Sequence, residues 1–466
     1  MKKSMLPRAS ALACCLLFVL TCLQSPPSHA LVAPSDSIEV LTETRLAAAT
    51  AAVEQGLSIA ATLNQRLVST PSACVRNQPD YACSGVLVRP MAAAHAVRFW
   101  EHDAEANARG SEAFVYLRSD RQQGALPGRG GYVLMSRFDA LANGKPYEVK
   151  ARPRPGEVQV NNWNAAQPNQ IAIEALYYNP AVPNDLFRAQ RSQLQWFKAT
   201  AAWLPILRYD GGVGARFGFD QSEQLYDGYL IAERINQRFT TVTATCPDGR
   251  ARYYCQGVWV RTTNIADVGR YRTWNPSPGS QRNNSVSFSW FSADTSVATT
   301  YHTQGFILRE SGYAVTQPLT LRCGYPRDAA TSGAADPCTF RGQCAALGIT
   351  TTAAWRARYG SGTNPGCAFG NDAAAFRVLI DLRNRQTGFV NAWNELMMAV
   401  WPQNVAAQLP LESFIYSAAN GRANAQVFQR EYVRDTLGRY LPVLFLNPTP
   451  PPNRLVTYNP DDQNVE

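Results

Sequence analysis

The chain has 466 residues, of which 45% are hydrophobic and 17% are charged, and it carries a formal net charge of +9. This is an ordinary globular composition, and the length leaves room for two or three domains. The basic residues are dispersed and no RNA- or DNA-binding motif occurs, so nucleic acid is not an expected partner. No P-loop, dinucleotide fingerprint or histidine metal frame occurs, so we expect neither a metal site nor a permanently bound cofactor.

Residues 1–30 have the pattern of a secretory signal peptide. The basic start Lys2-Lys3 precedes an apolar run, 11–23, that is too short to span a membrane, and Ser28-His29-Ala30 offers a small-x-small cleavage site. A lipobox ending at Cys22 is the weaker alternative, because a threonine stands before the cysteine. We therefore expect a secreted or periplasmic protein that is cleaved near Ala30 and has no membrane partner afterwards.

Eight of the 11 cysteines follow the signal segment, and an even number in an exported chain predicts disulfides. Two short loops that occupy equivalent places in two similar stretches are expected to be closed by one disulfide each, Cys74 with Cys83 and Cys246 with Cys255. The other four cysteines allow three pairings, and the sequence does not choose among them: Cys323, Cys338, Cys344 and Cys367.

A repeated pattern organises the chain. The stretch Tyr254–Thr263 alternates apolar residues with Trp259 and Arg261, which predicts a half-buried strand entered from a cysteine. A second copy lies earlier and ends at Arg89. Arg89 and Arg261 are 172 positions apart, as are Cys83 and Cys255, and we therefore expect two tandem copies of one module.

The predicted elements follow the same order in both copies: a helix, the arginine strand, two further strands, a second helix and a closing strand. After a flexible lead-in at 31–38, the first copy is expected to have its helices at 42–67 and 186–199 and its strands at 86–89, 113–117, 132–135 and after Leu204-Pro205. The second copy is expected to have its helices at 222–239 and 423–437, its strands at 254–263, 286–291, 306–308 and after Leu441-Pro442, and a further strand at 413–416 before its second helix.

The predicted fold class is α+β, with two duplicated modules that each combine a leading helix with a small, mainly antiparallel sheet. We expect a degenerate N-terminal copy at 31–215 and a catalytic C-terminal module at 220–447, with the Gly-rich segment 210–218 between them. The second module carries a disulfide-rich insertion at about 320–395, which is expected to contain a helix from 373 to about 400. A Pro-rich tail is expected at 448–466.

The second copy has an ordered set of polar residues that could act on a nucleotide. Arg261 offers a bidentate fork for a phosphate. Ser287 and Ser289 alternate with apolar residues and are expected on one face of their strand, which reads Ala113-Phe114-Val115-Tyr116 in the first copy. Glu412, when ionised, would stabilise the positive charge that develops as a glycosidic bond breaks.

This order resembles the Arg–Ser–Glu class of ADP-ribosyltransferases, and the region 222–447 is similar to the halovibrins, secreted NAD-cleaving proteins. The likeness rests on Val258-Trp259-Val260-Arg261-Thr262-Thr263, Ser287-Phe288-Ser289 and Gln408-Leu409-Pro410-Leu411-Glu412. The resemblance implies an ADP-ribosyltransferase fold for the second copy. It also implies roles for single residues, with NAD bound by Arg261, Thr262 and Gln408, the nicotinamide-ribose pocket organised by Ser287 or Ser289, and catalysis by Glu412.

Two departures from that pattern bear on the reaction. The central residue of the serine motif is Phe288 instead of threonine, and Pro410 stands two residues before Glu412, where the family usually has Gln or Glu. Because that earlier residue normally handles the acceptor, the departure favours hydrolysis of NAD over transfer to a protein.

The leading hypothesis is an exported NAD glycohydrolase or mono-ADP-ribosyltransferase, a toxin or effector with NAD as its substrate and, in the case of transfer, a protein acceptor. The alternative is a non-enzymatic, duplicated secreted module that binds a surface glycan or a protein partner. A peptidoglycan-active hydrolase is a weaker third hypothesis, because the usual Cys-His and zinc sets are missing.

Two further interpretations concern single residues. Arg89 and Glu174 are the first-copy counterparts of Arg261 and Glu412, so residues kept in both copies could form a structural ion pair instead of a catalytic site. Glu395 is interpreted as a solvated charge on the helix of the insertion, with a second active-site carboxylate as the alternative.

Overall fold

The computed structural model divides the chain into two compact units, residues 1–47 and 48–466. Helix α1 (Pro34–Val68) begins in the first unit and continues into the second, which holds both large sheets. The structure describes residues 34–69, 84–90, 111–120, 131–134, 141–142, 145–146, 148–150, 157–161, 173–209, 211, 214–242, 246–247, 255–263, 285–294, 302–308, 321–325, 348, 354, 395–399, 411–436, 440–447 and 453–464. The predicted signal peptide therefore lies outside the described residues.

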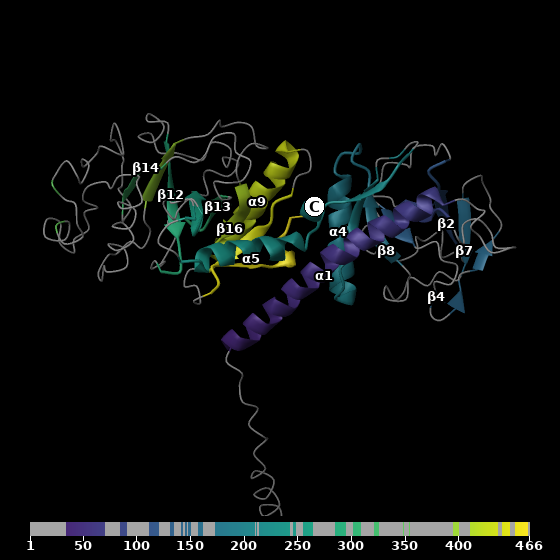
Figure 1. Ribbon diagram of the computed structural model, residues 1–466, viewed down its shortest axis with the longest axis horizontal. Helices are drawn as coiled ribbons and strands as arrows, with labels where there is room; N and C mark the ends of the chain where they lie inside the picture. Colours follow the sequence, from purple (N-terminus) through teal and green to yellow (C-terminus); the bar gives the residue numbers. More distant parts are fainter. Residues whose placement is uncertain are drawn as a thin grey trace, which may run out of the picture. The chain divides into compact units, whose positions relative to one another are not determined.

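The first half of the second unit is built on an eight-stranded sheet with the order β10-β9-β8-β3-β1-β2-β7-β6 (Figure 1). Its strands are β1 (Val86–Pro90), β2 (Ser111–Leu117), β3 (Gly131–Leu134), β6 (Glu148–Lys150), β7 (Glu157–Asn161), β8 (Ile173–Tyr178), β9 (Ile206–Tyr209) and β10 (Phe217–Phe219). A separate two-stranded sheet joins β4 (Leu141–Ala142) to β5 (Lys145–Pro146).

The second half is built on another eight-stranded sheet, with the order β14-β15-β12-β11-β13-β16-β17-β18. Its strands are β11 (Val258–Thr263), β12 (Ser285–Phe291), β13 (Gln304–Leu308), β14 (Leu321–Tyr325), β15 (Glu395–Ala399), β16 (Leu411–Tyr416), β17 (Val443–Leu446) and β18 (Val456–Tyr458). The mixture of helices and mainly antiparallel sheets confirms the predicted α+β class.

The two sheets have the same connectivity when their strands are taken in chain order. In each sheet one neighbouring pair is parallel, β8 with β9 and β16 with β17, and a helix makes the crossover. These helices are α4 (Asp185–Thr200) and α9 (Ala419–Asp435). Both sheets also have an irregular register at the equivalent place, next to Val133 in β3 and Ile307 in β13.

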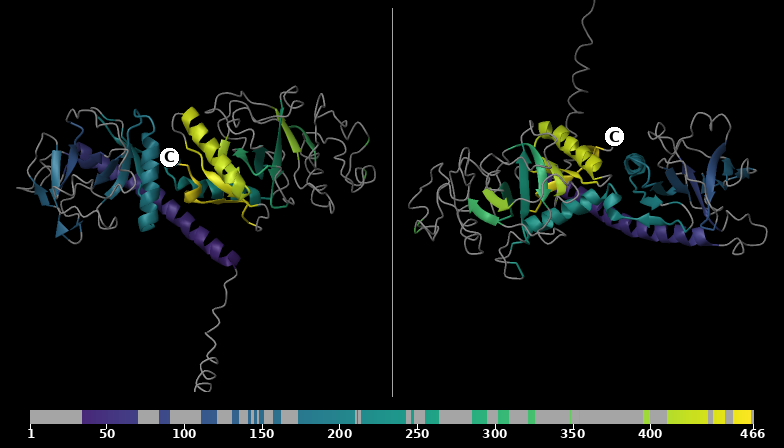
Figure 2. Two further views of the ribbon diagram at one scale, coloured as in Figure 1. Left: turned by 180° about the vertical axis from the view of Figure 1, so that it is seen from behind. Right: turned by 90° about the horizontal axis from the view of Figure 1, so that it is seen from above.

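Helices pack against both sheets, and most of the strand residues whose side chains the structure describes are buried. In the second half, α5 (Asp227–Thr240) and α9 lie on opposite sides of the sheet (Figure 2). Phe414 of β16 faces α9, because its ring contacts Phe428 and Tyr432 at centroid distances of 6.0 and 5.8 Å. In the first half, Leu63 and Leu67 of α1 pack with the buried valines of β1.

A pair of buried glutamines closes each half in the same way. Nε2 of Gln193 in α4 donates to Oε1 of Gln224 at 3.0 Å, and Gln224 bonds the backbone of the first residue of β9 in both directions. Gln429 of α9 and Gln463 are joined by the same bond at 3.0 Å, and Gln463 bonds the first residue of β17. These bonds satisfy buried amide groups that would otherwise cost about 1–3 kcal/mol each.

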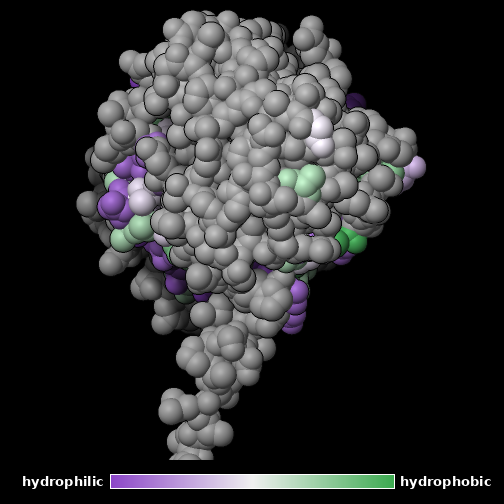
Figure 3. Space-filling view, turned by 90° about the vertical axis from the view of Figure 1, so that its left-hand side faces the viewer, coloured by the Kyte–Doolittle hydropathy of each residue, from purple (hydrophilic) through white to green (hydrophobic). Residues whose placement is uncertain are grey.

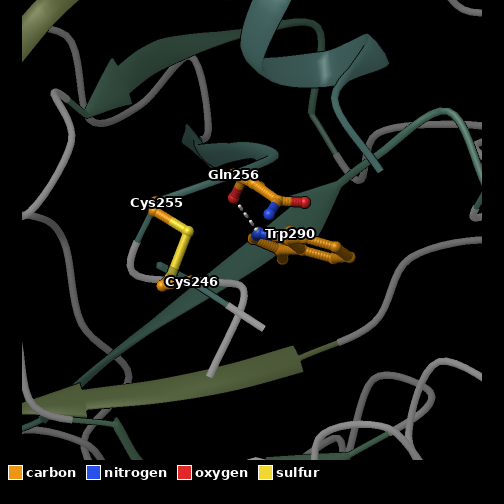
Figure 4. The surroundings of a disulfide bond; sticks show 4 residues. All are labelled: Cys246, Cys255, Gln256 and Trp290. Atoms are coloured by element: carbon orange, nitrogen blue, oxygen red, sulfur yellow. Dashed lines mark hydrogen bonds between the residues drawn. A yellow bond between two sulfur atoms is a disulfide. The ribbon is translucent and has the colours of Figure 1, made fainter. Parts of the chain in front are cut away.

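The predicted disulfide between Cys246 and Cys255 is present, with a Cα–Cα distance of 5.8 Å (Figure 4). The residues that follow it anchor the loop to strand β12, because Nε1 of Trp290 donates to the carbonyl oxygen of Gln256 at 3.0 Å. Gly257 is in the left-handed region (φ +70°), and its α-carbon lies so close to the indole of Trp290 that a Cβ would overlap the ring. The disulfide loop therefore continues directly into the packing of β11 against β12.

Three sequence predictions are wrong about local structure. Helix α1 begins at Pro34, so part of the predicted lead-in is helical. Residues 395–399 form strand β15 instead of the end of a helix, because pairing with β12 on one side and β14 on the other overrides the helical propensity of its Glu, Leu and Met residues. The predicted tail is also ordered in part, because β18 pairs with β17 as the edge of the sheet.

Two surface properties complete the description. Over Glu43–Val68, α1 is long and apolar enough to cross a membrane, a test that signal sequences and core helices also pass, and Leu63 and Leu67 lie in the core. Among the described residues, the exposed large hydrophobic side chains are Leu57, Val68 and Val242. The described residues visible in Figure 3 intermix hydrophilic and hydrophobic groups, with no broad hydrophobic patch among them.

Candidate functional site

Three neighbouring strands carry the chemistry-bearing residues of the second half. The sheet order places β15, β12 and β11 side by side. Arg261 lies on β11, Ser287 and Ser289 lie on β12, and Glu395 is the first residue of β15. Glu412, the catalytic residue expected from the sequence, lies on β16, which is separated from β12 by β11 and β13.

The serine strand has the predicted alternation. Ser287 and Ser289 are partly exposed, whereas Phe288 and Trp290 are buried. Phe288 meets Trp259 of β11 edge to face, with ring centroids 6.2 Å apart, so the aromatic side chains pack on one face of the sheet. The two serines therefore lie on the other face, level with Val260, which is the register partner of Ser289.

The side chain of Arg261 supports the serine strand by a hydrogen bond to the backbone of Ser287. Nη1 of Arg261 donates to the carbonyl oxygen of Ser287 at 2.7 Å. By alternation along β11, Arg261 lies on the face of Trp259 and opposite to that of Val260, so its side chain starts from the face opposite to the serine hydroxyls. The structure brings Arg261 next to β12, but it does not place its guanidinium on the same face as Ser289.

Glu412 belongs to a buried ion pair. Its two carboxylate oxygens accept from Nη1 and Nη2 of Arg238 on α5, the first at 3.2 Å, and Nε of Arg234 lies 3.9 Å from Oε1. Glu412 is 6% exposed and Arg238 is 9% exposed. Glu412 therefore lies in a buried ion pair, but its partner is Arg238 and not Arg261.

A β-bulge explains how Glu412 reaches α5. Leu411 pairs with Leu308 and Ser413 pairs with Ile307, so Glu412 is the extra residue between two consecutive partners. A bulge redirects the side chain of its extra residue. Glu174 has the same place in the first sheet, between Ile173 and Ala175. The bulge and its glutamate are thus common to both halves.

Distance across the sheet separates Glu412 from the serines. Strands β12 and β16 are three strand spacings apart, about 14 Å, which is far beyond hydrogen-bond reach. Glu412 and Ser289 therefore cannot act on one reacting atom in this arrangement, and the predicted combination of Ser287, Ser289 and Glu412 is not brought together.

Glu395 is the carboxylate-bearing residue that the sheet places beside the serines. Phe288 pairs with Leu396 and Ser287 with Met397, so the antiparallel register continued by one residue sets Glu395 level with Ser289. In the first sheet the corresponding pair is Val115 with Glu157, at the start of β7. Contrary to our interpretation of the sequence, Glu395 begins a strand and has a counterpart in the first half.

The sequence favours a solvated charge for Glu395 because its segment has the composition of a helix, whereas the structure places it on strand β15. At the positions of the serines the two halves differ, because Ala113 and Val115 stand in place of Ser287 and Ser289.

The other predicted site residues lie on β11, on β14 or outside the described residues. Oγ1 of Thr262 accepts from the backbone N–H of His302 at 3.3 Å, which ties β11 to the start of β13. Cys323 lies on β14. Outside the described residues lie Gln408, Cys74, Cys83, Cys338, Cys344 and Cys367. Within the described part of the chain, no group of three or more His, Cys, Asp or Glu residues could hold a metal ion.

A second acidic group lies near the ion pair. Burial raises the pKa of Asp227, the first residue of α5, to about 6, while the hydrogen bond from Gln221 (2.6 Å) and the charge of Arg234 oppose the shift. The charges of Asp220 and Glu412 add to the rise of the pKa. The start of α5 therefore holds a carboxylate that gains its charge close to neutral pH.

Comparison with known proteins gives no further guide, because a scan of protein-family models and a search of curated proteins both found no match to this chain.

Proposed function

We propose that the protein is an exported NAD-consuming enzyme, an NAD glycohydrolase or a mono-ADP-ribosyltransferase that breaks the nicotinamide–ribose bond. The observation that carries the proposal is the placement of the Ser287/Ser289 strand, β12, beside β15, whose register sets Glu395 level with Ser289. The resemblance of 222–447 to the halovibrins and to the Arg–Ser–Glu class supports the same reaction.

The proposed site differs in one residue from the sequence-based hypothesis. Glu395 supplies the carboxylate that stabilises the oxocarbenium-like charge on the ribose, in place of Glu412. Ser287 and Ser289 supply hydroxyls for the nicotinamide ribose, and Arg261 supports their strand through its bond to the carbonyl oxygen of Ser287. Glu412 keeps a structural role through its pair with Arg238.

We also propose that the two halves arose by duplication and that catalysis belongs to the second. Their common strand order, their equivalent bulges and their glutamine pairs support the duplication. The serine strand supports the division of labour, because the first half has Ala113 and Val115 at the equivalent positions. Secretion, a toxin or effector role and a protein acceptor are parts of this proposal.

The test is release of nicotinamide from NAD by the mature full-length protein. The wild-type protein and Glu412→Gln are expected to release nicotinamide at comparable rates per folded molecule, whereas Glu395→Gln is expected to release at least about a hundredfold less. Free ADP-ribose as the product indicates hydrolysis, and an added ADP-ribose mass on a protein indicates transfer.

Two results would count against the proposal. No release above buffer by the wild-type protein would favour the duplicated, non-enzymatic binding module. Loss of activity in a folded Glu412→Gln, with full activity in Glu395→Gln, would return the catalytic role to Glu412.

A further inference from the structure

The disulfide loop of the second half contacts the serine strand directly. The bond between Cys246 and Cys255 lies in the connection between the end of α5 and the start of β11. Gln256 follows Cys255, is 4% exposed, and accepts the indole N–H of Trp290 with its carbonyl oxygen at 3.0 Å (Figure 4). Trp290 lies on β12, so the loop contacts the strand that carries the two serines.

The same corner is bonded to the end of α5. The N–H of Gly257, the residue before β11, donates to the carbonyl oxygen of Arg238 at 2.8 Å. The N–H of Ala293, just beyond β12, donates to the carbonyl oxygen of Phe239 at 2.8 Å. Because β11 and β12 are antiparallel, the start of one strand and the end of the other meet at this corner. The last turn of α5 and the disulfide loop therefore hold the same point of the sheet.

Formation of the disulfide restricts this connection. It runs over residues 241–257, and the bond ties together two cysteines that are nine positions apart. Without the bond, the connection has more conformational freedom to lose before the carbonyl group of Gln256 can meet Trp290. Gly257 adds to that cost, because it occupies the left-handed region (φ +70°) and glycine loses the most backbone freedom on folding. The disulfide therefore favours the backbone arrangement that satisfies the indole N–H.

Trp290 connects this arrangement to a serine. Its side chain is 0% exposed, so movement of the carbonyl group of Gln256 takes a hydrogen-bond acceptor away from a buried donor, which is unfavourable. The indole also packs so closely on Gly257 that a shift of this glycine moves the ring. Ser289 directly precedes Trp290 in β12, and displacement of the tryptophan therefore reaches the serine along the strand.

Other contacts of the second half do not use this loop. The side chain of Arg238 pairs with Glu412, which joins α5 to β16. Gln429 of α9 bonds Gln463, which in turn bonds the first residue of β17. These contacts hold α5, α9, β16 and β17 whether or not the disulfide is formed. We therefore expect loss of the bond to loosen the corner of β11 and β12 while the rest of the half stays folded.

The first half has an equivalent corner that lacks the serines. Gly85 is in the left-handed region (φ +67°) and lies against Tyr116, which takes the place of Trp290. The hydroxyls of Ser84 and Tyr116 are joined by a hydrogen bond at 2.8 Å. The cysteines expected to close this loop, Cys74 and Cys83, lie outside the described residues. Their removal is a matched control, because it changes the same kind of loop in the half without a serine strand.

We propose that the Cys246–Cys255 disulfide is an oxidation-dependent switch that fixes the serine strand, β12, in place. On oxidation the two thiols form the S–S bond and pass two electrons and two protons to a disulfide-bearing oxidant, which becomes a dithiol. In the reverse direction a thiolate of the dithiol attacks the sulfur of Cys255, which is partly exposed, and displaces the thiolate of Cys246, which is 3% exposed. The second thiol of the dithiol then frees Cys255 and closes its own disulfide.

The consequence for activity rests on the proposed NAD-cleaving function. A reducing cytosol keeps the two cysteines as thiols, and an oxidising compartment outside it forms the bond. The serine strand is then fixed only after export, so the chain does not cleave the NAD of the cell that makes it. Oxidation thus becomes the signal that starts the reaction proposed for the second half.

Hydrogen exchange followed by mass spectrometry tests the structural step on the mature full-length protein without any use of NAD. The double variant Cys246→Ser/Cys255→Ser removes this bond alone. We expect amide exchange in β12 to become about tenfold faster or more, whereas exchange in β16 stays within about twofold. The matched control, Cys74→Ser/Cys83→Ser, is expected to leave exchange in β12 unchanged.

Nicotinamide release tests the consequence for activity. At saturating NAD, Cys246→Ser/Cys255→Ser is expected to lower the rate about tenfold or more, whereas Cys74→Ser/Cys83→Ser keeps the wild-type rate. Trp290→Phe lacks the indole N–H that the loop binds. In that background, removal of the disulfide is expected to lower the rate by less than about threefold further, because the contact that transmits the effect is already lost.

Three results would overturn the proposal. They are unchanged exchange in β12, an equal rise of exchange in β12 and β16, and full activity of Cys246→Ser/Cys255→Ser. If the oxidised wild-type protein releases no nicotinamide, the proposed function fails, and the exchange of β12 still decides whether the disulfide fixes the serine strand.

Discussion

The guanidinium of Arg238 donates hydrogen bonds to the carboxylate of Glu412 from both of its terminal nitrogens, and both side chains are buried. This contact joins α5, the leading helix of the second half, to the bulge of β16. Because this carboxylate is buried in an ion pair, its removal is expected to change the stability of the fold.

Removing one partner of this pair is expected to be costly. Glu412→Ala leaves the guanidinium of Arg238 buried without its counter-charge and should lower the free energy of unfolding by about 3–5 kcal/mol. The double variant Arg238→Met/Glu412→Leu should recover most of that loss, since an apolar pair of similar volume removes the uncompensated charge. Urea unfolding followed by tryptophan fluorescence measures both. A loss well below about 3 kcal/mol in Glu412→Ala, or a double variant that is less stable than Glu412→Ala, would contradict a structural ion pair.

The serines should affect turnover and leave stability nearly unchanged. Ser287→Ala and Ser289→Ala are each expected to lower the rate of nicotinamide release by about tenfold or more, with a change in unfolding free energy within about 1 kcal/mol, because both side chains are partly exposed.

Ser413→Ala is the matched control for these two variants. Its hydroxyl is buried, has no hydrogen-bond partner among the described residues, and lies on β16, three strands from β12. The variant should keep full activity. Equal losses in all three serine variants would assign the effect to the sheet as a whole instead of to the serine strand.

Asp227 predicts a pH-dependent stability. Its pKa is about 6 in the folded chain against an ordinary value of 3.8, so the folded state holds the proton over that interval and the unfolded state does not. Stability therefore falls as the pH rises from about 4 to about 6, by about 3 kcal/mol for a shift of two pKa units.

The variant Asp227→Asn has no charge to bury, and it should lose this pH dependence. Relative to the wild-type protein, it is expected to gain up to about 3 kcal/mol between pH 3.5 and pH 7.5, measured by chemical unfolding at each pH. If the unfolding free energies of the two proteins change with pH in the same way, burial of the Asp227 charge does not have the predicted cost.

Gly257 tests the anchoring of the disulfide loop on Trp290. Gly257→Ala places a Cβ in the left-handed region and against the indole, and it should lower stability by about 2–4 kcal/mol. Gly214→Ala has a similar backbone (φ +79°) with open space around it, so it isolates the backbone contribution of about 1 kcal/mol. Thermal unfolding of both variants measures the difference. Equal effects would mean that the contact with Trp290 is not tight.

The sequence by itself determined the features that depend on short stretches. The alternation of Ser287, Phe288, Ser289 and Trp290 predicted a strand with its aromatic residues on one face, and the structure confirms it. Repeated spacings predicted similar element orders in the two halves, and the helices predicted at 186–199 and 423–437 match α4 and α9 to within a few residues. These signals are local because side-chain direction repeats every 2 or 3.6 residues.

Only the tertiary structure decided which of the polar residues lie on neighbouring strands. Glu395 came beside Ser289 because β15 pairs with β12, a contact between segments more than a hundred residues apart that no local pattern encodes. Glu412 turned toward Arg238 because a bulge in β16 reversed the direction that simple alternation predicts. Strand pairing and bulges depend on long-range packing and register, and they therefore moved the candidate carboxylate from Glu412 to Glu395.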